Sequence, residues 1–396
     1  MAIGFTSRAA VSTCALCTVG LLALAPAAAT AGTRPNPAPR AGSGARAAPD
    51  SLLYRSGTQV RPRAEAPEVP ELSARSWLVA DADSGEVLAA HDAHRRLPPA
   101  STLKTLFALT VLPVLPGGLR HTVSEEELAD VGPGSSRVGV AEDHTYRISD
   151  LWNGVFLSSG NDAVHVLAAL NGGWRVTAER MQEKARALGA HDTWVKSPDG
   201  YDAPGQVSSA FDLAVFGRAG LHSPDFARYC SRVEAMFPGR DGGSYGILNT
   251  NRLLTGADGV DRYPGLVGIK NGYTSNAGNT LVAAARRNGH TLVATVLNPR
   301  SGGGHTVYEE ARALLDWGFE ASGRVDPVGS LDALRATSLP GPRGRPAAGP
   351  TPASAPEVRD AGPERPVAWT ITCTALLGAA GVALFLRLRW GPAVSG

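Results

Sequence analysis

The stretch Pro99-Ala100-Ser101-Thr102-Leu103-Lys104 places a serine and a lysine three positions apart, directly after a pair of prolines. The prolines hold the preceding backbone extended, and apolar residues then recur with helical spacing from 103 to 111. We therefore expect a helix that begins at Ser101, with Lys104 on the same face one turn later. A serine hydroxyl becomes a good nucleophile only beside a base, and a lysine can serve as that base because burial disfavours its charged form. The alternative is a serine that caps a helix, followed by a solvated lysine.

The rarity of lysine favours the chemical interpretation of this stretch. Only four of the 38 Lys and Arg residues are lysines, at positions 104, 184, 196 and 270. Arginine is not deprotonated in proteins, so a chain this rich in arginine is expected to keep lysine where a proton must be released.

Both ends of the chain differ in composition from its middle. Residues 1–31 have the pattern of a secretory signal peptide, which is cleaved after Ala29 or Ala31 or else retained as an anchor. Residues 32–72 are rich in Pro, Ala, Arg and Gly and are expected to be disordered, and 323–366 are expected to be a linker of similar composition.

The uncharged run 367–386 is long enough to cross a bilayer, and Arg387 and Arg389 follow it. We therefore expect residues 387–396 to form a short cytoplasmic tail. The protein is then located at the cell membrane, with residues 73–322 as an extracytoplasmic catalytic domain.

The cysteine, charge and histidine patterns exclude several kinds of site. Cys230 is the only cysteine outside the two apolar end segments, so we expect no disulfide within the domain. The net charge of +2 gives no reason to expect a nucleic acid partner. His91 and His94 are assigned to a solvated loop, and no cluster has the spacing of metal ligands, so neither a metal nor an organic cofactor is expected.

The middle of the chain alternates between helical and strand patterns. A hairpin is expected at 76–81 and 87–90, and a second at 280–285 and 291–297 across Asn288-Gly289. Helices are expected at 148–157, 163–170, 176–188, 210–221 and 307–319. The helix at 210 is expected to be capped by Ser208 or Ser209.

Two further motifs follow the first in order. Ser159-Gly160-Asn161 lies between two of the expected helices, where it has an alternative interpretation as capping residues, and Lys270-Asn271-Gly272 lies in a strand. Together with Ser101 and Lys104, these motifs resemble the S-x-x-K, S-x-N and K-T-G motifs of penicillin-recognising serine enzymes. Over about residues 73–321 the chain is similar to the low-molecular-mass D-alanyl-D-alanine carboxypeptidases.

The resemblance implies a fold and an activity. The fold is the α/β (α+β) fold of β-lactamases and transpeptidases, in which an antiparallel sheet is flanked by helices and joined to an all-helical lobe. The active site lies between the sheet and the lobe. The implied activity removes the terminal D-alanine from peptidoglycan stem peptides that end in D-Ala-D-Ala, and β-lactams such as penicillin inhibit it by acylating the serine.

The resemblance also implies a role for each catalytic residue. Ser101 is the nucleophile that forms the acyl-enzyme, and Lys104 is the base for acylation. Ser159 relays a proton to the leaving nitrogen. Asn161 holds Lys104 and the amide of the substrate.

The substrate-binding residues implied by the resemblance are Lys270, Asn271, Gly272, Tyr273 and Thr274. Lys270 supplies positive charge for the terminal carboxylate and disfavours the charged form of Lys104. The backbone amides of Ser101 and Tyr273 form the oxyanion hole. Asn271 departs from the family pattern because it replaces a threonine whose hydroxyl binds the carboxylate. Its amide can donate instead, and Thr274 is close in sequence.

Three other functions use the same or a related fold. A β-lactamase needs a glutamate with an asparagine four residues later, and neither Glu179 nor Glu183 is followed by one. A catalytically idle module that binds peptidoglycan requires the loss of motif residues, and only Asn271 supports it. A transpeptidase would use the same residues as a carboxypeptidase, so the sequence does not separate these two activities.

Overall fold

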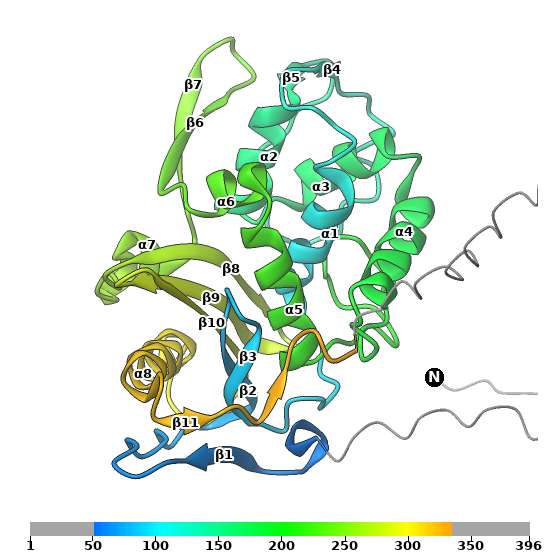
Figure 1. Ribbon diagram of the computed structural model, residues 1–396. Coiled ribbons are helices and arrows are strands. Elements are labelled where there is room, and N and C mark those ends of the chain that lie inside the picture. The colour runs from blue at the N-terminus through cyan, green and yellow to red at the C-terminus, as the bar shows by residue number, and fades with distance from the viewer. Residues whose placement is uncertain (1–50, 335–396) are drawn as a thin grey trace, which may run out of the picture. The chain divides into compact units, whose positions relative to one another are not determined.

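The computed structural model describes residues 51–334. Its centre is an antiparallel sheet of eight strands in the order β11-β1-β3-β2-β10-β9-β8, with β12 paired to β3 (Figure 1). The strands are β1 (Thr58–Pro62), β2 (Ala74–Asp81), β3 (Glu86–His91), β8 (Leu266–Thr274), β9 (Gly278–Arg287), β10 (His290–Pro299), β11 (Val325–Asp326) and β12 (Gly329–Ser330). Both expected hairpins are present. Asn288 and Gly289, with φ of 49° and 84°, form the tight turn between β9 and β10.

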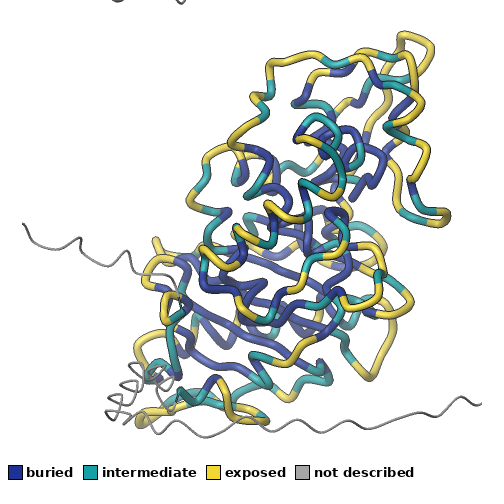
Figure 2. Tube along the Cα trace, turned by 90° about the vertical axis from the view of Figure 1, so that its right-hand side faces the viewer, coloured by how far each residue is buried: buried dark blue, intermediate teal, exposed yellow. Residues whose placement is uncertain are grey.

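Alternate residues of the central strands belong to two separate hydrophobic cores. In β2, Leu78 and Ala80 face one core, whereas Trp77 and Val79 face the other. Helix α8 (Thr306–Ala321) covers one face of the sheet, and α5 (Ala210–Leu221) and α1 (Lys104–Val111) lie on the opposite side (Figure 1). The buried residues follow the strands and the helices packed against them, while exposed residues are concentrated in loops and hairpin tips (Figure 2).

A lobe built mainly of helices stands beyond the α5 face of the sheet (Figure 1). Its elements are α2 (Ile148–Leu157), α3 (Asn161–Leu170), α4 (Trp174–Ala187), α6 (Pro224–Cys230) and the short hairpins β4–β5 (Arg120–Thr122, Thr145–Arg147) and β6–β7 (Glu234–Pro238, Ser244–Leu248). The expected helical lobe is therefore present, and two short hairpins accompany its helices. The short helix α7 (Arg252–Thr255) leads from β7 toward β8.

The boundaries expected for the domain were wrong at both ends. Residues 51–72 were expected to be disordered, but they form the 3₁₀ helix η1 (Leu52–Tyr54) and strand β1, which pairs with β3 and β11. Residues 323–334 were expected to be linker, but β11 and β12 complete the same side of the sheet. The Pro- and Arg-rich composition of these segments does not indicate strands. The strands form because neighbouring strands supply their hydrogen bonds.

The expected signal peptide, the rest of the linker, the membrane span 367–386 and the tail lie outside the described residues. Within 51–334, no helix is long and apolar enough to span a membrane.

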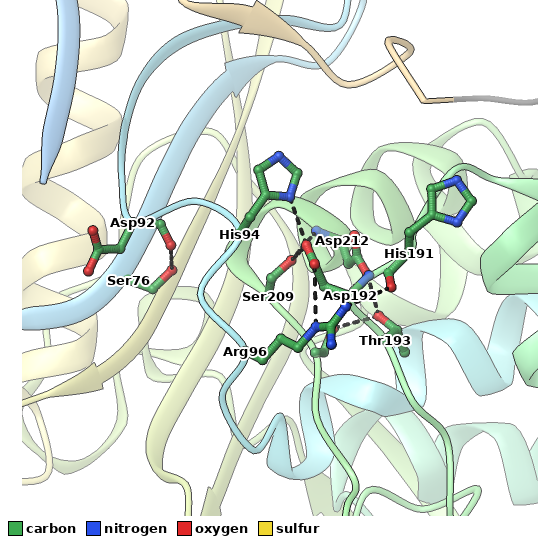
Figure 3. Close-up of polar contacts among 10 residues, drawn as sticks. Ser76, Asp92, His94, Arg96, His191, Asp192, Thr193, Ser209 and Asp212 are labelled. Atoms are coloured by element: carbon green, nitrogen blue, oxygen red, sulfur yellow. Dashed lines mark hydrogen bonds and ion pairs between the residues drawn. The ribbon is translucent and has the colours of Figure 1, made fainter. Parts of the chain in front are cut away.

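A buried polar cluster supports the loop that leads from β3 to Ser101. His94 Nδ1 and Ser209 Oγ lie 2.7 and 2.9 Å from the same carboxylate oxygen of Asp192 (Figure 3). Tyr54 stacks on the His94 ring at a centroid distance of 4.1 Å. The assignment of His94 to a solvated loop was therefore wrong. No local pattern indicated this contact, because Asp192 lies 98 residues away in the sequence.

Asp212 lies in the same cluster and is fully buried. Its Oδ2 accepts hydrogen bonds from the Asp192 amide and from Thr193 Oγ1, at 2.9 and 2.7 Å, whereas its Oδ1 has no partner among residues 51–334 (Figure 3). Burial and the nearby Asp192 charge raise the pKa of the Asp212 carboxyl to about 7. Ser209, the expected N-cap of α5, accepts from the Asp212 amide at 3.1 Å.

Candidate active site

Ser101 lies in a 3₁₀ turn, Ala100–Leu103, that continues directly into α1. The α-helix itself begins at Lys104, so the expected helix is present but its first turn is tighter than an α-helix. Ala100 has a φ of 50°, which is a strained conformation for alanine and turns the chain immediately before Ser101. Thr280 on β9 donates to the Pro99 carbonyl at 3.0 Å and ties this turn to the sheet.

Lys104 is buried against three hydrogen-bond acceptors. Its Nζ donates to Ser101 Oγ at 2.8 Å, to Asn161 Oδ1 at 2.7 Å and to the Asp199 carbonyl at 2.7 Å. These contacts use all three protons of the ammonium. Burial lowers the pKa of Lys104 to about 8, although Asp199 and Asp162 act in the opposite direction. A neutral amine beside Ser101 is therefore accessible near neutral pH.

Lys270, on β8, is as deeply buried as Lys104 but has fewer partners. The Nζ of Lys270 donates to the Asn271 carbonyl at 2.9 Å. Burial, together with the charge of Lys104, lowers the pKa of Lys270 well below its ordinary value. The two ammonium groups are thus close enough to repel each other. Among the described residues Lys270 has one acceptor against three for Lys104, so Lys270 holds its proton less firmly.

Ser159 lies in the turn between α2 and α3 with a φ of 56°. Its side chain is buried, and its Oγ has no hydrogen-bond partner in the described part of the chain. A strained backbone and an unsatisfied buried hydroxyl are unfavourable for stability alone, and such features are concentrated at functional sites.

Asp162 fixes the loop that forms the lobe side of the site. The Asp162 carboxylate accepts from the amides of Val138, Gly139 and Val140 at 2.9, 2.7 and 2.9 Å. The Asn161 backbone amide donates to the Ser136 carbonyl at 2.8 Å. The turn that carries Ser159 and Asn161 is therefore held to the 136–140 loop from both sides.

The third motif lies on β8, which is an edge strand of the sheet. A Cβ added at Gly272 would lie 2.6 Å from the Ser101 amide and 2.8 Å from Thr280 Oγ1. Only glycine allows the nucleophile turn to approach the strand this closely. The side-chain amide of Asn271 is held by Thr250, which donates to Oδ1 at 2.9 Å, and by Tyr308, whose OH accepts from Nδ2 at 3.2 Å.

Most of the expected site residues line one cavity of about 290 Å³ between β8 and the lobe. Its walls include Ser101, Ser159, Asn161 and the stretch 271–275, together with 134–136, Tyr201, Asp202 and Thr250. Lys104 and Lys270 lie beneath this surface, where they are 1% exposed. Tyr273 is 66% exposed at the rim of the cavity.

Sequence analysis missed several residues that shape the site. Asp199, which supplies a carbonyl to Lys104, belongs to the loop Ser197-Pro198-Asp199-Gly200 and was not among the predicted site residues. Thr250 and Tyr308 carried no sequence signal, because only the fold brings them to Asn271. Among the described residues, no group of His, Cys and carboxylate side chains could hold a metal ion.

The fold and this site together define a serine enzyme of the transpeptidase-like class. Residues 63–301 match the peptidase S11 family model, described as D-alanyl-D-alanine carboxypeptidase. The chain is 42% identical over 275 residues to the D-alanyl-D-alanine carboxypeptidase DacB2 of Mycobacterium tuberculosis, a match that covers 69% of this chain and 90% of that protein. The chain therefore belongs to the S11 family of serine-type D-alanyl-D-alanine carboxypeptidases.

Solved structures agree with this assignment. A D-alanyl-D-alanine carboxypeptidase from Mycobacterium tuberculosis superposes with a TM-score of 0.63 at 38% identity, covering 69% of this chain and all of that one. Penicillin-binding protein 6B of Escherichia coli gives a TM-score of 0.57 at 32% identity, and the match covers 67% of this chain and 82% of that one. Other carboxypeptidases that match, from Escherichia coli and Bacillus subtilis, are longer, and the chain spans 62–65% of them.

Proposed function

We propose that this protein removes the terminal D-alanine from peptidoglycan stem peptides through an acyl-enzyme on Ser101. The observation that carries the proposal is the 2.8 Å contact between Lys104 Nζ and Ser101 Oγ, made by a lysine whose pKa burial lowers to about 8. The neutral amine takes the hydroxyl proton while Ser101 Oγ attacks the carbonyl carbon of the penultimate D-alanine. The amides of Ser101 and Tyr273 stabilise the oxyanion.

Departure of the terminal D-alanine needs a proton on its nitrogen. Ser159 is suited to relay this proton from Lys104, since its hydroxyl is buried at the cavity and has no other partner in the described structure. Water then attacks the ester carbonyl, which releases the shortened peptide and returns a proton to Ser101 Oγ.

The terminal carboxylate of the substrate binds at Lys270 and Asn271. Burial and the Lys104 charge lower the pKa of Lys270. A carboxylate nearby favours the charged form of Lys270, and that charge in turn disfavours protonation of Lys104. Substrate binding therefore favours the neutral form of the lysine that acts as the base.

Intact-mass spectrometry of the purified protein after incubation with benzylpenicillin tests this proposal. We expect a single penicilloyl adduct on the parent protein and none on Ser101→Ala. An intact antibiotic without an adduct would indicate an idle module, whereas a hydrolysed antibiotic without a lasting adduct would indicate a β-lactamase. Release of D-alanine from a D-Ala-D-Ala peptide, with and without an amine acceptor, separates carboxypeptidase from transpeptidase.

We further propose that the protein acts at the outer face of the cell membrane. The support comes from the sequence alone, in the apolar stretch within 1–31 and in the run 367–386 followed by arginines. Membrane fractionation of the full chain and of a chain truncated before 367 tests this location. Recovery of both proteins in the same fraction would contradict an anchor at 367–386.

A further inference from the structure

Asp202 is the only charged residue among the described residues that line the catalytic cavity. It belongs to the loop that follows Asp199 and Gly200, and it reaches across to the end of β8. Its Oδ1 accepts from Thr274 Oγ1 at 2.8 Å, and its Oδ2 accepts from the Asn276 amide at 3.3 Å. In residues 51–334, no Lys, Arg or His forms an ion pair with this carboxylate. One end of the cavity thus carries a negative charge that no basic side chain neutralises.

The proposed function sets the direction in which a peptide crosses the cavity. Its terminal carboxylate lies at Lys270 and Asn271, and its scissile carbonyl lies at Ser101. The part of the peptide before the scissile bond therefore runs along the edge of β8 toward Thr274, where Asp202 is bound.

The length of the substrate agrees with this direction. An extended peptide advances about 3.4 Å per residue, so the residue before D-Ala-D-Ala lies about 7 Å upstream of the terminal residue. From that position a lysine-like side chain extends further toward the Asp202 end. Tyr201 and Tyr273, which precede Asp202 and Thr274 in the chain, also line the cavity, and their aromatic rings offer apolar surface to the aliphatic stem of that side chain.

We propose that Asp202 forms a cation subsite for the side-chain amine of the residue that precedes D-Ala-D-Ala. This inference rests on the proposed function and narrows its substrate class to stem peptides whose diamino acid keeps a free, protonated amine. Acylation of that amine, as in a cross-linked stem, removes the charge and leaves the Asp202 carboxylate without its partner. The enzyme therefore prefers uncross-linked stems.

The effect of one solvent-accessible ion pair on kcat/KM is about 1.5- to fivefold. A suitable test compares Nα-acyl-L-Lys-D-Ala-D-Ala with the same peptide acetylated on its side-chain amine. The parent protein is expected to cleave the free-amine peptide with a kcat/KM about 1.5- to fivefold higher, and the preference is expected to fall with added salt. In Asp202→Asn, which keeps an oxygen acceptor for Thr274, the ratio should approach one. Asp241→Asn, in the exposed turn of the β6–β7 hairpin, is the matched control and should keep the parent ratio.

Two kinds of result would overturn the inference. If Asp202→Asn slows both peptides equally, the carboxylate braces the end of β8 and does not recognise a cation. If the parent protein shows no preference, the subsite does not exist. Failure of the proposed function is recognised separately, because the parent would then cleave neither peptide and form no penicilloyl adduct, and the inference would fail with it.

Discussion

Thr250 Oγ1 donates a 2.9 Å hydrogen bond to Asn271 Oδ1, which fixes the side-chain amide at the position where the family motif has a threonine. On the other side of the amide, Nδ2 donates to the OH of Tyr308 at 3.2 Å. The Tyr308 OH also accepts from Arg252 at 3.2 Å and donates to the Thr250 carbonyl at 3.3 Å, so its hydrogen-bonding capacity is filled. One N–H of Asn271 is left without a protein acceptor in the described structure, and Asn271 lines the cavity. This N–H can replace the missing hydroxyl as a donor to the substrate carboxylate.

Tyr308→Phe is expected to weaken carboxylate recognition. The substitution removes the acceptor that orients Asn271 Nδ2, so only the Thr250 hydrogen bond still holds the amide, and we expect KM to rise about three- to tenfold with a smaller change in kcat. The measurement compares a D-Ala-D-Ala peptide with its C-terminal amide, which has no carboxylate. Thr250→Val should act in the same direction. An unchanged preference for the acid over the amide in both variants would show that Asn271 is not positioned by this network.

The acylation rate is expected to depend on pH through Lys104. The pKa of Lys104 is lowered from 10.5 to about 8, so the neutral base is scarce below pH 8 and predominates above it. The rate of benzylpenicillin acylation should therefore rise about tenfold per pH unit up to about pH 8 and then level off. Lys104→Arg should be inactive throughout, because arginine is not deprotonated. A rate that is flat between pH 6 and 8 in the parent protein would exclude Lys104 as the titrating base.

The sequence predicted those parts of the fold and site that depend on local patterns. The Ser101–Lys104 spacing placed both residues on one helical turn, and their side chains do meet at 2.8 Å. The helix at 210–221 has the bounds that its periodicity and cap predicted. The Asn288-Gly289 turn was equally clear, because a tight hairpin needs positive φ at both positions.

The remaining features depend on contacts between distant residues. Strands β1 and β11 are short. Strand β1 forms because β3 and β11 supply its hydrogen bonds, and β11 forms because β1 supplies them. The Asn271 network joins residues 250, 271 and 308, whose proximity follows from the path of the chain and from no local pattern. The weaker hold of Lys270 on its proton was likewise not visible, because it follows from the number of acceptors around each lysine.

Ser159→Ala is expected to reduce activity without reducing stability. The Ser159 hydroxyl is buried and has no partner in the described structure, so its removal breaks no hydrogen bond. The free energy of unfolding should change by less than about 0.5 kcal/mol, whereas loss of the proton relay should lower kcat by about 100-fold or more. Urea unfolding and steady-state cleavage of a D-Ala-D-Ala peptide provide the two measurements. A stable variant with full activity would remove Ser159 from the mechanism.

Asp212→Asn is expected to flatten the dependence of stability on pH. In the folded protein, burial and the Asp192 charge raise the pKa of Asp212 from 3.8 to about 7. Between these two pH values the folded state keeps a proton on Asp212 that the unfolded chain releases. The resulting contribution to the free energy of unfolding is fully present below about pH 4 and is lost as the pH rises through 7. From pH 5 to pH 8 the loss attributable to Asp212 is on the order of 2–3 kcal/mol.

Asparagine at position 212 is neutral at every pH and keeps an oxygen for Thr193 and for the Asp192 amide. The free energy of unfolding of the variant should therefore be close to that of the parent at pH 5 and larger than that of the parent at pH 8. Urea unfolding at the two pH values measures this difference, and Asp241→Asn, in an exposed turn, should leave the parent's pH dependence unchanged. If Asp212→Asn lost stability between pH 5 and pH 8 by as much as the parent, Asp212 would not be the source of the pH dependence.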